Sequence, residues 1–355
     1  MERLESRIER FLRTGSGDFE DLALELFAHQ FEKSPPYQAY CKAQNRTPGY
    51  VRMWEEIPAV PIAAFKSADL ATFPVGRAAA VFHSSGTTQK TPSRHFLKTL
   101  TFYEASLEAG FSKNVLFQTD PAPFLILAPS PSEAPHSSLS WMLDVVNRRW
   151  GLPAGRQGMP GGGFYIQRGL VEDGRLFRAL EETQAAGSPI ALLGTTLAFL
   201  AFFDQCAKQN KSFLCPTGSR LMDTGGMKTQ AREVTRGEFL RRVWSTLGIP
   251  EAGCINEYGM CELSSQFYAR GASPVFKGPP WVRTLVVNPN TGAPLPEGET
   301  GWLTHFDLAN VDSALAVQTE DEGIAHPEGF VLLGRARSAG LKGCSVDMEA
   351  YLKRQ

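Results

Sequence analysis

The chain has 355 residues, and its 36 basic and 37 acidic residues give a formal net charge of −1. Because there is no basic excess, we expect no nucleic-acid partner. The hydrophobic content of 43% fits a globular protein with a sizeable core, and no apolar run is long enough to predict a membrane span. The charged N-terminus differs from a signal peptide and the six cysteines form no C-x-x-C pair, which favours a cytoplasmic protein with reduced thiols. The sequence leaves the oligomeric state open.

In chain order, the first predicted element is a helical N-terminal region at residues 1–75, in which Asp18 or Asp21 can cap a helix. Residues 76–279 then alternate short apolar runs with helical patterns. The predicted strands are 78–82, 124–127 and 190–193, and the predicted helices are 100–111, 139–150 and 176–186. This alternation predicts an α/β fold with a doubly wound parallel sheet. A ligand would lie at the carboxyl ends of the strands, where loop 83–90 follows the first of them.

The character of the sequence changes near residue 280. Alternating segments at 281–287 and 301–306 flank the turn-rich residues 288–292, which predicts a hairpin in a small antiparallel β subdomain over residues 280–333. Another strand is expected at 331–333. Residues 334–355 are then expected to form a short C-terminal tail.

A hydroxyl-rich turn follows the first predicted strand. Ser84, Ser85, Gly86, Thr87 and Thr88 can direct backbone N–H and side-chain O–H groups at one anion, and the glycine allows close approach. Turns of this composition are common, so on local grounds an ordinary loop is at least as good an interpretation. The chain has neither a G-x-x-x-x-G-K-[ST] nor a G-x-G-x-x-G motif, which argues against a P-loop kinase and a dinucleotide-dependent dehydrogenase.

Two later segments carry groups that suit a nucleotide. Gly225 and Gly226 allow close backbone approach to a flat ligand such as adenine, although for this segment taken alone an ordinary turn is the favoured interpretation. Further on, Tyr258 beside Gly259 can stack on a base, and Glu262 can hold Mg²⁺.

Two segments nearer the C-terminus add to this set. Asp321 lies in an acidic turn and can accept hydrogen bonds from ribose hydroxyls, with a solvated turn as the alternative interpretation. Arg335 follows a glycine and can neutralise phosphate or bind ribose.

Taken in this order, the five motifs resemble the adenylate-forming superfamily of acyl and aryl acid ligases. The closest resemblance is to the acyl-protein synthetase family, the fatty-acid ligase component of bacterial luminescence systems, and it extends over residues 25–350. It implies ATP and Mg²⁺ as cofactors, with residues 84–88 on the ATP phosphates and Gly225, Gly226, Tyr258 and Gly259 on the adenine side.

The resemblance also implies roles for the remaining positions. Glu262 would bind magnesium, Asp321 would bind ribose, and Arg335 would act in catalysis together with Glu262. The family carries an acyl-accepting cysteine near its C-terminus, which matches Cys344; a cysteine filling a gap in the core is the alternative interpretation.

The sequence departs from the family pattern at several positions. The phosphate loop usually ends in Pro-Lys, and here either Lys90 or Arg94 would supply the basic side chain. Cys261 replaces the usual threonine, and Ser338 replaces the usual hinge aspartate. Relatives continue into a mobile lid domain with a catalytic lysine, which we expect to be absent or vestigial in a chain that stops at Gln355.

The expected activity is ATP-dependent conversion of a carboxylic acid, a fatty acid by resemblance, to an acyl-adenylate, followed by transfer to Cys344. The expected partner is an acyl-accepting reductase or acyltransferase. Two alternatives are an acyl- or aryl-CoA ligase of the phenylacetate type and a nucleotide-binding relative without catalysis. The sequence does not identify the acid.

Overall fold

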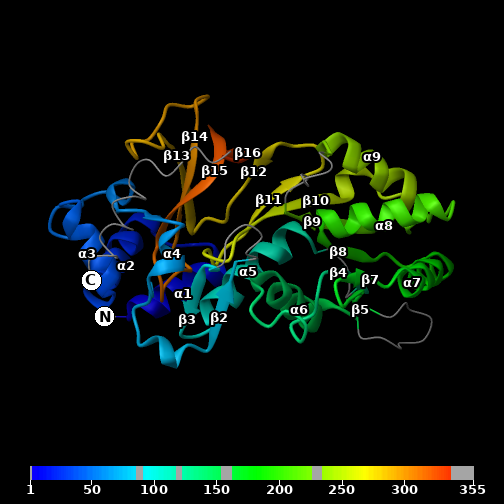
Figure 1. The fold of residues 1–355 in the computed structure, drawn as a ribbon, viewed down its shortest axis with the longest axis horizontal. Helices are drawn as coiled ribbons and strands as arrows, with labels where there is room; N and C mark the ends of the chain where they lie inside the picture. Colours follow the sequence, from blue (N-terminus) through cyan, green and yellow to red (C-terminus); the bar gives the residue numbers. More distant parts are fainter. Residues whose placement is uncertain (1, 85–90, 117–121, 153–161, 226–233, 337–355) are drawn as a thin grey trace. The chain divides into compact units, whose positions relative to one another are not determined.

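The computed structural model describes residues 2–84, 91–116, 122–152, 162–225 and 234–336 (Figure 1). Two units make up the chain, each assembled from segments that are distant in sequence. Unit 1 comprises Met1–Gly110, Met260–Phe267 and Val275–Gln355, and unit 2 comprises Phe111–Gly259 and Tyr268–Pro274. The N-terminal helices and the C-terminal strands therefore share unit 1. The domain boundaries drawn from the sequence stay a prediction.

Unit 1 begins with the predicted helical region. Its helices are α1 (Leu4–Thr14), α2 (Phe19–Lys33), α3 (Pro35–Ala43) and the short α4 (Ala64–Ser67), with 3-10 turns η1 (Trp54–Glu56) and η2 (Val75–Arg77), and α5 (Thr101–Asn114) starts in this unit. The carboxylate of Asp18 accepts a hydrogen bond from the backbone N–H of Asp21 at 3.2 Å. Asp18, one of the two predicted residues, therefore caps α2.

A six-stranded sheet forms the second part of unit 1. Its strands are β1 (Val60–Pro61), β12 (Val275–Phe276), β13 (Val282–Val287), β14 (Thr300–Asp307), β15 (Ala316–His326) and β16 (Gly329–Arg335). They lie in the order β12-β16-β15-β14-β13, and β1 pairs in parallel with β15 (Figure 1). The antiparallel pairing of β13 with β14 confirms the predicted hairpin.

The first predicted strand forms, but its place in the fold differs from the prediction. Strand β2 (Ala80–His83) pairs antiparallel with β3 (Arg94–Leu97) in a separate two-stranded sheet of unit 1. The predicted phosphate loop therefore connects two strands of a hairpin and does not follow a strand of the parallel sheet. The apolar run at 78–82 indicates a strand but carries no information about its pairing partner, and only Phe82 in β2 is buried.

Unit 2 contains the predicted parallel sheet. Strands β5 (Gly163–Phe164), β4 (Phe124–Leu127), β8 (Ala191–Thr195), β9 (Arg220–Thr224) and β10 (Cys254–Tyr258) are parallel neighbours in this order, and β11 (Phe267–Arg270) flanks β10. The helices are α6 (Ser138–Trp150), α7 (Asp173–Ala186), α8 (Thr196–Lys208) and α9 (Arg236–Leu247), with the small hairpin β6 (Ile166–Gln167) and β7 (Leu170–Val171) and the turn η3 (Glu251–Gly253). The predicted α/β fold class is thereby confirmed.

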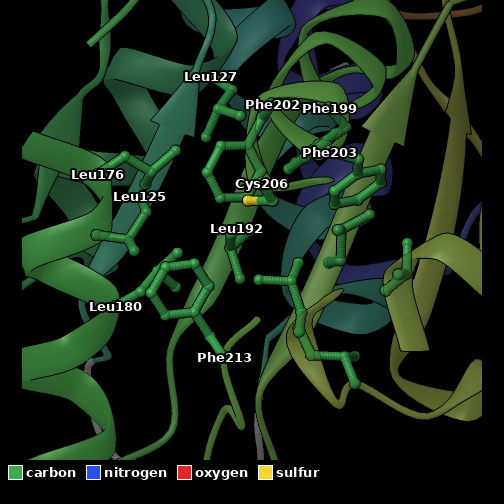
Figure 2. Close-up of a cluster of buried hydrophobic side chains, with 14 of the residues drawn as sticks. Leu125, Leu127, Leu176, Leu180, Leu192, Phe199, Phe202, Phe203, Cys206 and Phe213 are labelled. Atoms are coloured by element: carbon green, nitrogen blue, oxygen red, sulfur yellow. The ribbon is translucent and has the colours of Figure 1, made fainter. Parts of the chain in front are cut away.

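The core of unit 2 lies between this sheet and the helices α7, α8 and α9. Figure 2 shows Phe199, Phe202 and Phe203 of α8 beside leucines of β4 and β8. Apolar side chains of this size each contribute about 1.5–3 kcal/mol when fully buried. Phe199 and Leu200, near the start of α8, thus lie in this core.

Candidate active site

Ser84 and Ser93 meet where the β2–β3 connection begins and ends. The backbone N–H of Ser93 donates to Ser84 Oγ at 2.9 Å, and the N–H of Ser84 donates to the carbonyl oxygen of Ser93 at 3.3 Å. Ser93 is 1% exposed. Of the predicted phosphate loop, the structure describes Ser84, whereas residues 85–88 lie outside the described residues.

Glu262, the predicted magnesium ligand, belongs to unit 1 and is 2% exposed. Burial raises the pKa of its carboxyl group. Hydrogen bonds from the Ser93 hydroxyl and the Cys261 thiol lower the pKa of Glu262, and so does the positive charge of Arg335. The structure therefore brings together the end of the predicted phosphate loop, the predicted metal ligand and the predicted basic residue.

Hydrogen bonds fix the backbone on both sides of Glu262. His95 Nδ1 lies 2.7 Å from the carbonyl oxygen of Cys261, which can only accept, so Nδ1 carries the proton. Burial lowers the pKa of His95 to about 4, which keeps the ring neutral. Asn310 donates from Nδ2 to the carbonyl oxygen of Glu262 at 3.0 Å. Both peptide groups that flank the glutamate side chain are thus held in place.

The residues that follow Glu262 are anchored by Asp307 at the end of β14. Its carboxylate, which is fully buried, accepts the backbone N–H groups of Ser264 at 3.0 Å and of Ser265 at 2.8 Å. It also accepts the Ser265 hydroxyl at 2.7 Å and the Ala309 N–H at 2.9 Å. Burial raises the pKa of Asp307 to about 6, and these four donors limit the rise.

Asp321 and Arg335 lie directly opposite each other on β15 and β16. The hydroxyl of Thr319 accepts the backbone N–H of Asp321 at 3.0 Å and donates to the carbonyl of Leu303 at 2.8 Å, which fixes this part of β15. The Arg335 side chain is 67% exposed and lies 4.0 Å from Glu320. An ion pair this exposed and this long stabilises the fold little, so the guanidinium is accessible to an anion.

The two candidates for the basic residue of the loop differ in what the structure shows. Arg94 forms an ion pair with Asp69 at 3.0 Å, and its guanidinium lies over the ring of Phe96 at 5.5 Å. Lys90 lies outside the described residues. Because Asp69 already neutralises Arg94, we favour Lys90 for the phosphates as a proposal.

In unit 2, a buried polar network lies at the carboxyl ends of β8, β9 and β10. Asp223 is fully buried and forms an ion pair with Arg236 at 2.6 Å. Its carboxylate also accepts the Thr196 hydroxyl at 3.0 Å and the Asn256 amide at 2.9 Å. The carboxyl ends of parallel strands are where α/β sheets bind ligands.

The adenine-side residues predicted from the sequence lie next to this network. Gly225 follows β9 with a φ of +89°, a conformation that favours glycine, and no described atom lies within 4 Å of the position that a Cβ would take. Tyr258 ends β10 and is 8% exposed, while Gly259 is exposed. Gly226 lies outside the described residues. The roles of these residues toward adenine stay a prediction.

Glu257 precedes Tyr258 and accepts a short hydrogen bond from the Thr224 hydroxyl on the neighbouring strand. Burial raises the pKa of Glu257, and the nearby charge of Asp223 adds to this rise. The hydrogen bond from Thr224 acts in the opposite direction, and the net pKa is about 7. Ser93, Asp223, Arg236 and Glu257 are among the residues of these networks that were not predicted from the sequence. Asp223 lies two positions before Gly225, and Glu257 directly precedes Tyr258. Polar residues next to the glycine and tyrosine motifs are therefore the sequence feature from which these two could have been predicted.

Cys344 lies outside the described residues, and the five other cysteines can be compared directly. All five are buried. Burial raises the pKa of four of these thiols to about 12, namely those of Cys41, Cys206, Cys215 and Cys254. It raises the pKa of Cys261 as well. None of these five described thiols is therefore available as a thiolate near neutral pH.

No cluster of three or more His, Cys, Asp or Glu side chains that could hold a metal occurs among the described residues. A single buried carboxylate, Glu262, still fits Mg²⁺ that arrives with a nucleotide, because this ion usually takes one or two protein carboxylates and completes its shell with phosphates and water. In the same described residues, no helix has both the length and the apolar character that crossing a bilayer requires.

Comparison with known proteins extends these observations. The sequence model of the family "Acyl-protein synthetase, LuxE" matches residues 170–353, slightly more than half of the chain. The chain is 24% identical over 178 residues to a long-chain-fatty-acid–luciferin-component ligase of Vibrio harveyi, an alignment covering 48% of this chain and 47% of that protein. It is 19% identical over 347 residues to the ligase of the same name from Aliivibrio fischeri, covering 94% and 88%.

Two solved structures share the fold. An open conformation of 2-hydroxyisobutyryl-CoA ligase, in complex with 2-HIB-AMP and CoA, has a TM-score of 0.62 at 14% identity and covers 94% of this chain and 74% of that chain. ATP-bound MatB from Rhodopseudomonas palustris has a TM-score of 0.52 at 15% identity and covers 74% and 49%. The chain therefore spans about half the length of MatB and of the aligned Vibrio harveyi ligase.

Proposed function

The chain belongs to the acyl-protein synthetase family, and we propose that it activates a carboxylic acid as an acyl-adenylate with ATP as the second substrate. The observation that carries this proposal is the assembly in unit 1 of Glu262, Ser93 and Arg335, with Asp321 opposite Arg335 on the neighbouring strand. We take a long-chain fatty acid as the first candidate, because both curated relatives are named for that substrate.

In the proposed first step, a carboxylate oxygen of the acid attacks the α-phosphorus of ATP. The bond from this phosphorus to the oxygen that bridges to the β-phosphate breaks, and pyrophosphate leaves. Because both reactants are anionic, catalysis requires neutralisation of charge and positioning. Arg335 is an accessible cation of unit 1 for this purpose, and the loop at residues 84–88 would add hydrogen-bond donors.

The remaining residues would hold the nucleotide. Asp321 would accept hydrogen bonds from the ribose hydroxyls, and residues 225, 226, 258 and 259 would bind the adenine. Glu262 would hold Mg²⁺, which as a bound cation would neutralise phosphate charge. Glu262 is prepared for this role because its backbone is fixed and its carboxylate is already removed from bulk water.

In the proposed second step, a thiolate sulfur attacks the acyl carbonyl carbon, the carbon–oxygen bond to AMP breaks, and a thioester forms. We propose Cys344 as this acceptor, since the five other cysteines are buried with raised pKa values. The thiol proton would pass to solvent, and the acyl group would then go to a partner reductase or acyltransferase. Coenzyme A in place of Cys344 is the competing acceptor.

The test separates the two steps. ATP–pyrophosphate exchange is measured with acids of increasing chain length, and exchange with at least one acid is expected. Covalent labelling with that acid in radioactive form should then give a hydroxylamine-sensitive label that Cys344→Ala loses and the neighbouring control Ser345→Ala keeps. Exchange should survive in both variants, because it reports the first step alone. Failure of exchange with every acid contradicts the proposal, whereas CoA-dependent thioester release without protein labelling identifies a CoA ligase.

A further inference from the structure

A cavity of about 450 Å³ lies in unit 1, and all of its lining residues belong to that unit. Strands β13, β14 and β15 contribute Leu285, Thr304 and Gln318 to its lining. These three residues form one row across the sheet, because Leu285 pairs with Thr304 and Thr304 pairs with Gln318. Small-molecule sites are typically cavities of about 300–1,000 Å³ with apolar walls and a few polar groups.

Two buried side chains of this row carry polar groups without protein partners. Thr304 is 3% exposed, and its hydroxyl oxygen has no hydrogen-bond partner. Gln318 is 7% exposed, and its side-chain amide forms no hydrogen bond within the described part of the chain. Leaving a buried polar group unsatisfied is unfavourable, so such groups usually bind protein, water or a ligand. The staggered rotamers of threonine exchange its hydroxyl and methyl groups, so the Thr304 hydroxyl can turn toward a ligand.

Contacts within the protein hold the wall opposite the sheet in place. Tyr40 of α3 lines the cavity and donates from Oη to the carbonyl oxygen of Ala59 at 2.9 Å. Trp54 of η1 packs edge-on against Phe306 of β14, with the ring centroids 5.0 Å apart. Phe306 and Leu285 also line the cavity as apolar groups. The cavity is therefore formed by the protein alone and can enclose an apolar body.

The exposed part of the lining is acidic. It includes Arg46, Glu55 and Glu56. Arg46 lies 3.4 Å from Glu56, and the Glu56 carboxylate also accepts the backbone N–H of Arg52 at 2.9 Å. Glu55 is exposed and forms no ion pair with a described residue. Because Arg46 is already neutralised by Glu56, the charge of Glu55 favours a positively charged group at this end of a ligand.

We propose that this cavity binds a small organic cation. Its apolar body would carry a hydroxyl or amide group at the inner end, beside Thr304 and Gln318, and an ammonium group at the outer end, beside Glu55. The inference goes beyond the proposed function, because none of these residues was assigned to the candidate active site. Tyramine has this arrangement of hydroxyl, ring and ammonium group and serves as the probe.

Titrations followed by saturation-transfer difference NMR compare tyramine with two analogues, each changed at one end. Phenethylamine lacks the hydroxyl group, and para-hydroxyphenylpropionate carries a carboxylate in place of the ammonium group. The wild type should bind tyramine about 2–10-fold more tightly than phenethylamine, the factor that one hydrogen bond supplies. It should bind the carboxylate analogue more weakly than tyramine, and Glu55→Gln should weaken tyramine binding by about 2–5-fold.

Thr304→Val and Gln318→Met remove the two polar groups with little change in side-chain volume. Each variant should weaken tyramine binding by about 2–10-fold and leave the affinity for phenethylamine unchanged, because that analogue has no hydroxyl to bind there. Thr304→Val should also raise the midpoint of thermal unfolding without a probe, because it removes an unsatisfied buried hydroxyl.

Thr319→Val is the matched control for this stability effect. Thr319 lies on β15 and is 1% exposed, but its hydroxyl donates to the carbonyl oxygen of Leu303 at 2.8 Å and accepts the backbone N–H of Asp321 at 3.0 Å. Removing this satisfied hydroxyl should lower the midpoint of thermal unfolding. Circular dichroism establishes that each variant is folded, and Gln318→Met carries the binding test if Thr304→Val is not.

Three results would overturn the proposal. The first is a wild type that does not bind tyramine. The second is equal tyramine affinity in the wild type, Thr304→Val and Gln318→Met, which would place the probe elsewhere on the protein. The third is a carboxylate analogue that binds as tightly as tyramine, since the ligand would then not be a cation. Pyrophosphate exchange is measured without tyramine, so the proposed function is tested separately from this site.

Discussion

Replacing Glu257 with glutamine should remove one pH-dependent contribution to the stability of the protein. Glu257 is 5% exposed at the end of β10, and its pKa rises from 4.5 to about 7. Between these two values the native protein keeps a proton that the unfolded chain has released. The contribution of Glu257 to wild-type stability therefore falls as the pH rises from about 4.5 to about 7, and this loss is complete above the folded pKa.

The size of this effect follows from the shift in pKa. One unit corresponds to about 1.4 kcal/mol, so the rise from 4.5 to about 7 makes the ionised side chain unfavourable by about 3 kcal/mol. Glutamine resembles the protonated carboxyl group and carries no charge at any pH. At pH 5 the variant and the wild type should therefore differ little, and at pH 8 Glu257→Gln should be more stable by about 3 kcal/mol.

Urea unfolding of both proteins at several pH values between 5 and 8 measures this difference. Other titrating groups occur in both proteins, so their contributions cancel when the two free energies of unfolding are subtracted. Glu299→Gln, at an exposed position on the chain, controls for removal of a carboxylate in general. A difference between Glu257→Gln and wild type that stays constant across this range would refute the argument from burial.

Substitutions at three further positions test the local physics. Arg236→Met leaves the buried carboxylate of Asp223 without the cation at 2.6 Å and should lower the free energy of unfolding by about 3–5 kcal/mol in urea titrations, with a smaller loss for Arg236→Lys. Gly225→Ala places a side chain at a φ of +89° and should destabilise by about 1–2 kcal/mol; equal stability of Gly225→Ala and wild type would contradict this strain. Burial lowers the pKa of His305 to about 3, so the free energy of unfolding of the wild type relative to His305→Phe should fall by about 1.4 kcal/mol for each pH unit from pH 6.5 down to about pH 3, as urea unfolding of both proteins measures.

Local patterns in the sequence predicted the local elements of this fold. Periodicity placed the helix at 139–150, which the structure shows as α6, and turn residues placed the hairpin of β13 and β14. The helix cap at Asp18 also followed from residue type and position. In each case the interactions that form the element join residues that are close in sequence or belong to one regular pattern. A short stretch of sequence is therefore enough to predict the element.

The pairing of β2 and the contacts of the candidate site could not be predicted in this way. An apolar run such as 78–82 fits a parallel or an antiparallel neighbour equally well, and the choice of β3 depends on packing across the whole unit. Ser93 is a common loop residue until the fold places it beside Glu262, far along the chain. The ion pair between Asp223 and Arg236 likewise forms only when the chain returns after β9.

Four buried carboxylates show how this fold tolerates charge in its interior. Asp223 has the cation of Arg236, and Asp307 has four hydrogen-bond donors. Glu257 has a pKa of about 7, so its carboxyl group is partly protonated at neutral pH. A buried carboxylate requires a cation, a set of donors or a proton.

Glu262 differs from the other three in what surrounds it. Its described hydrogen-bond donors are the Ser93 hydroxyl, the Cys261 thiol and its own backbone, and Arg335 acts on it only through its charge. No cation is paired with the Glu262 carboxylate among the described residues. The metal ion of the proposed metal–ATP substrate would supply this positive charge.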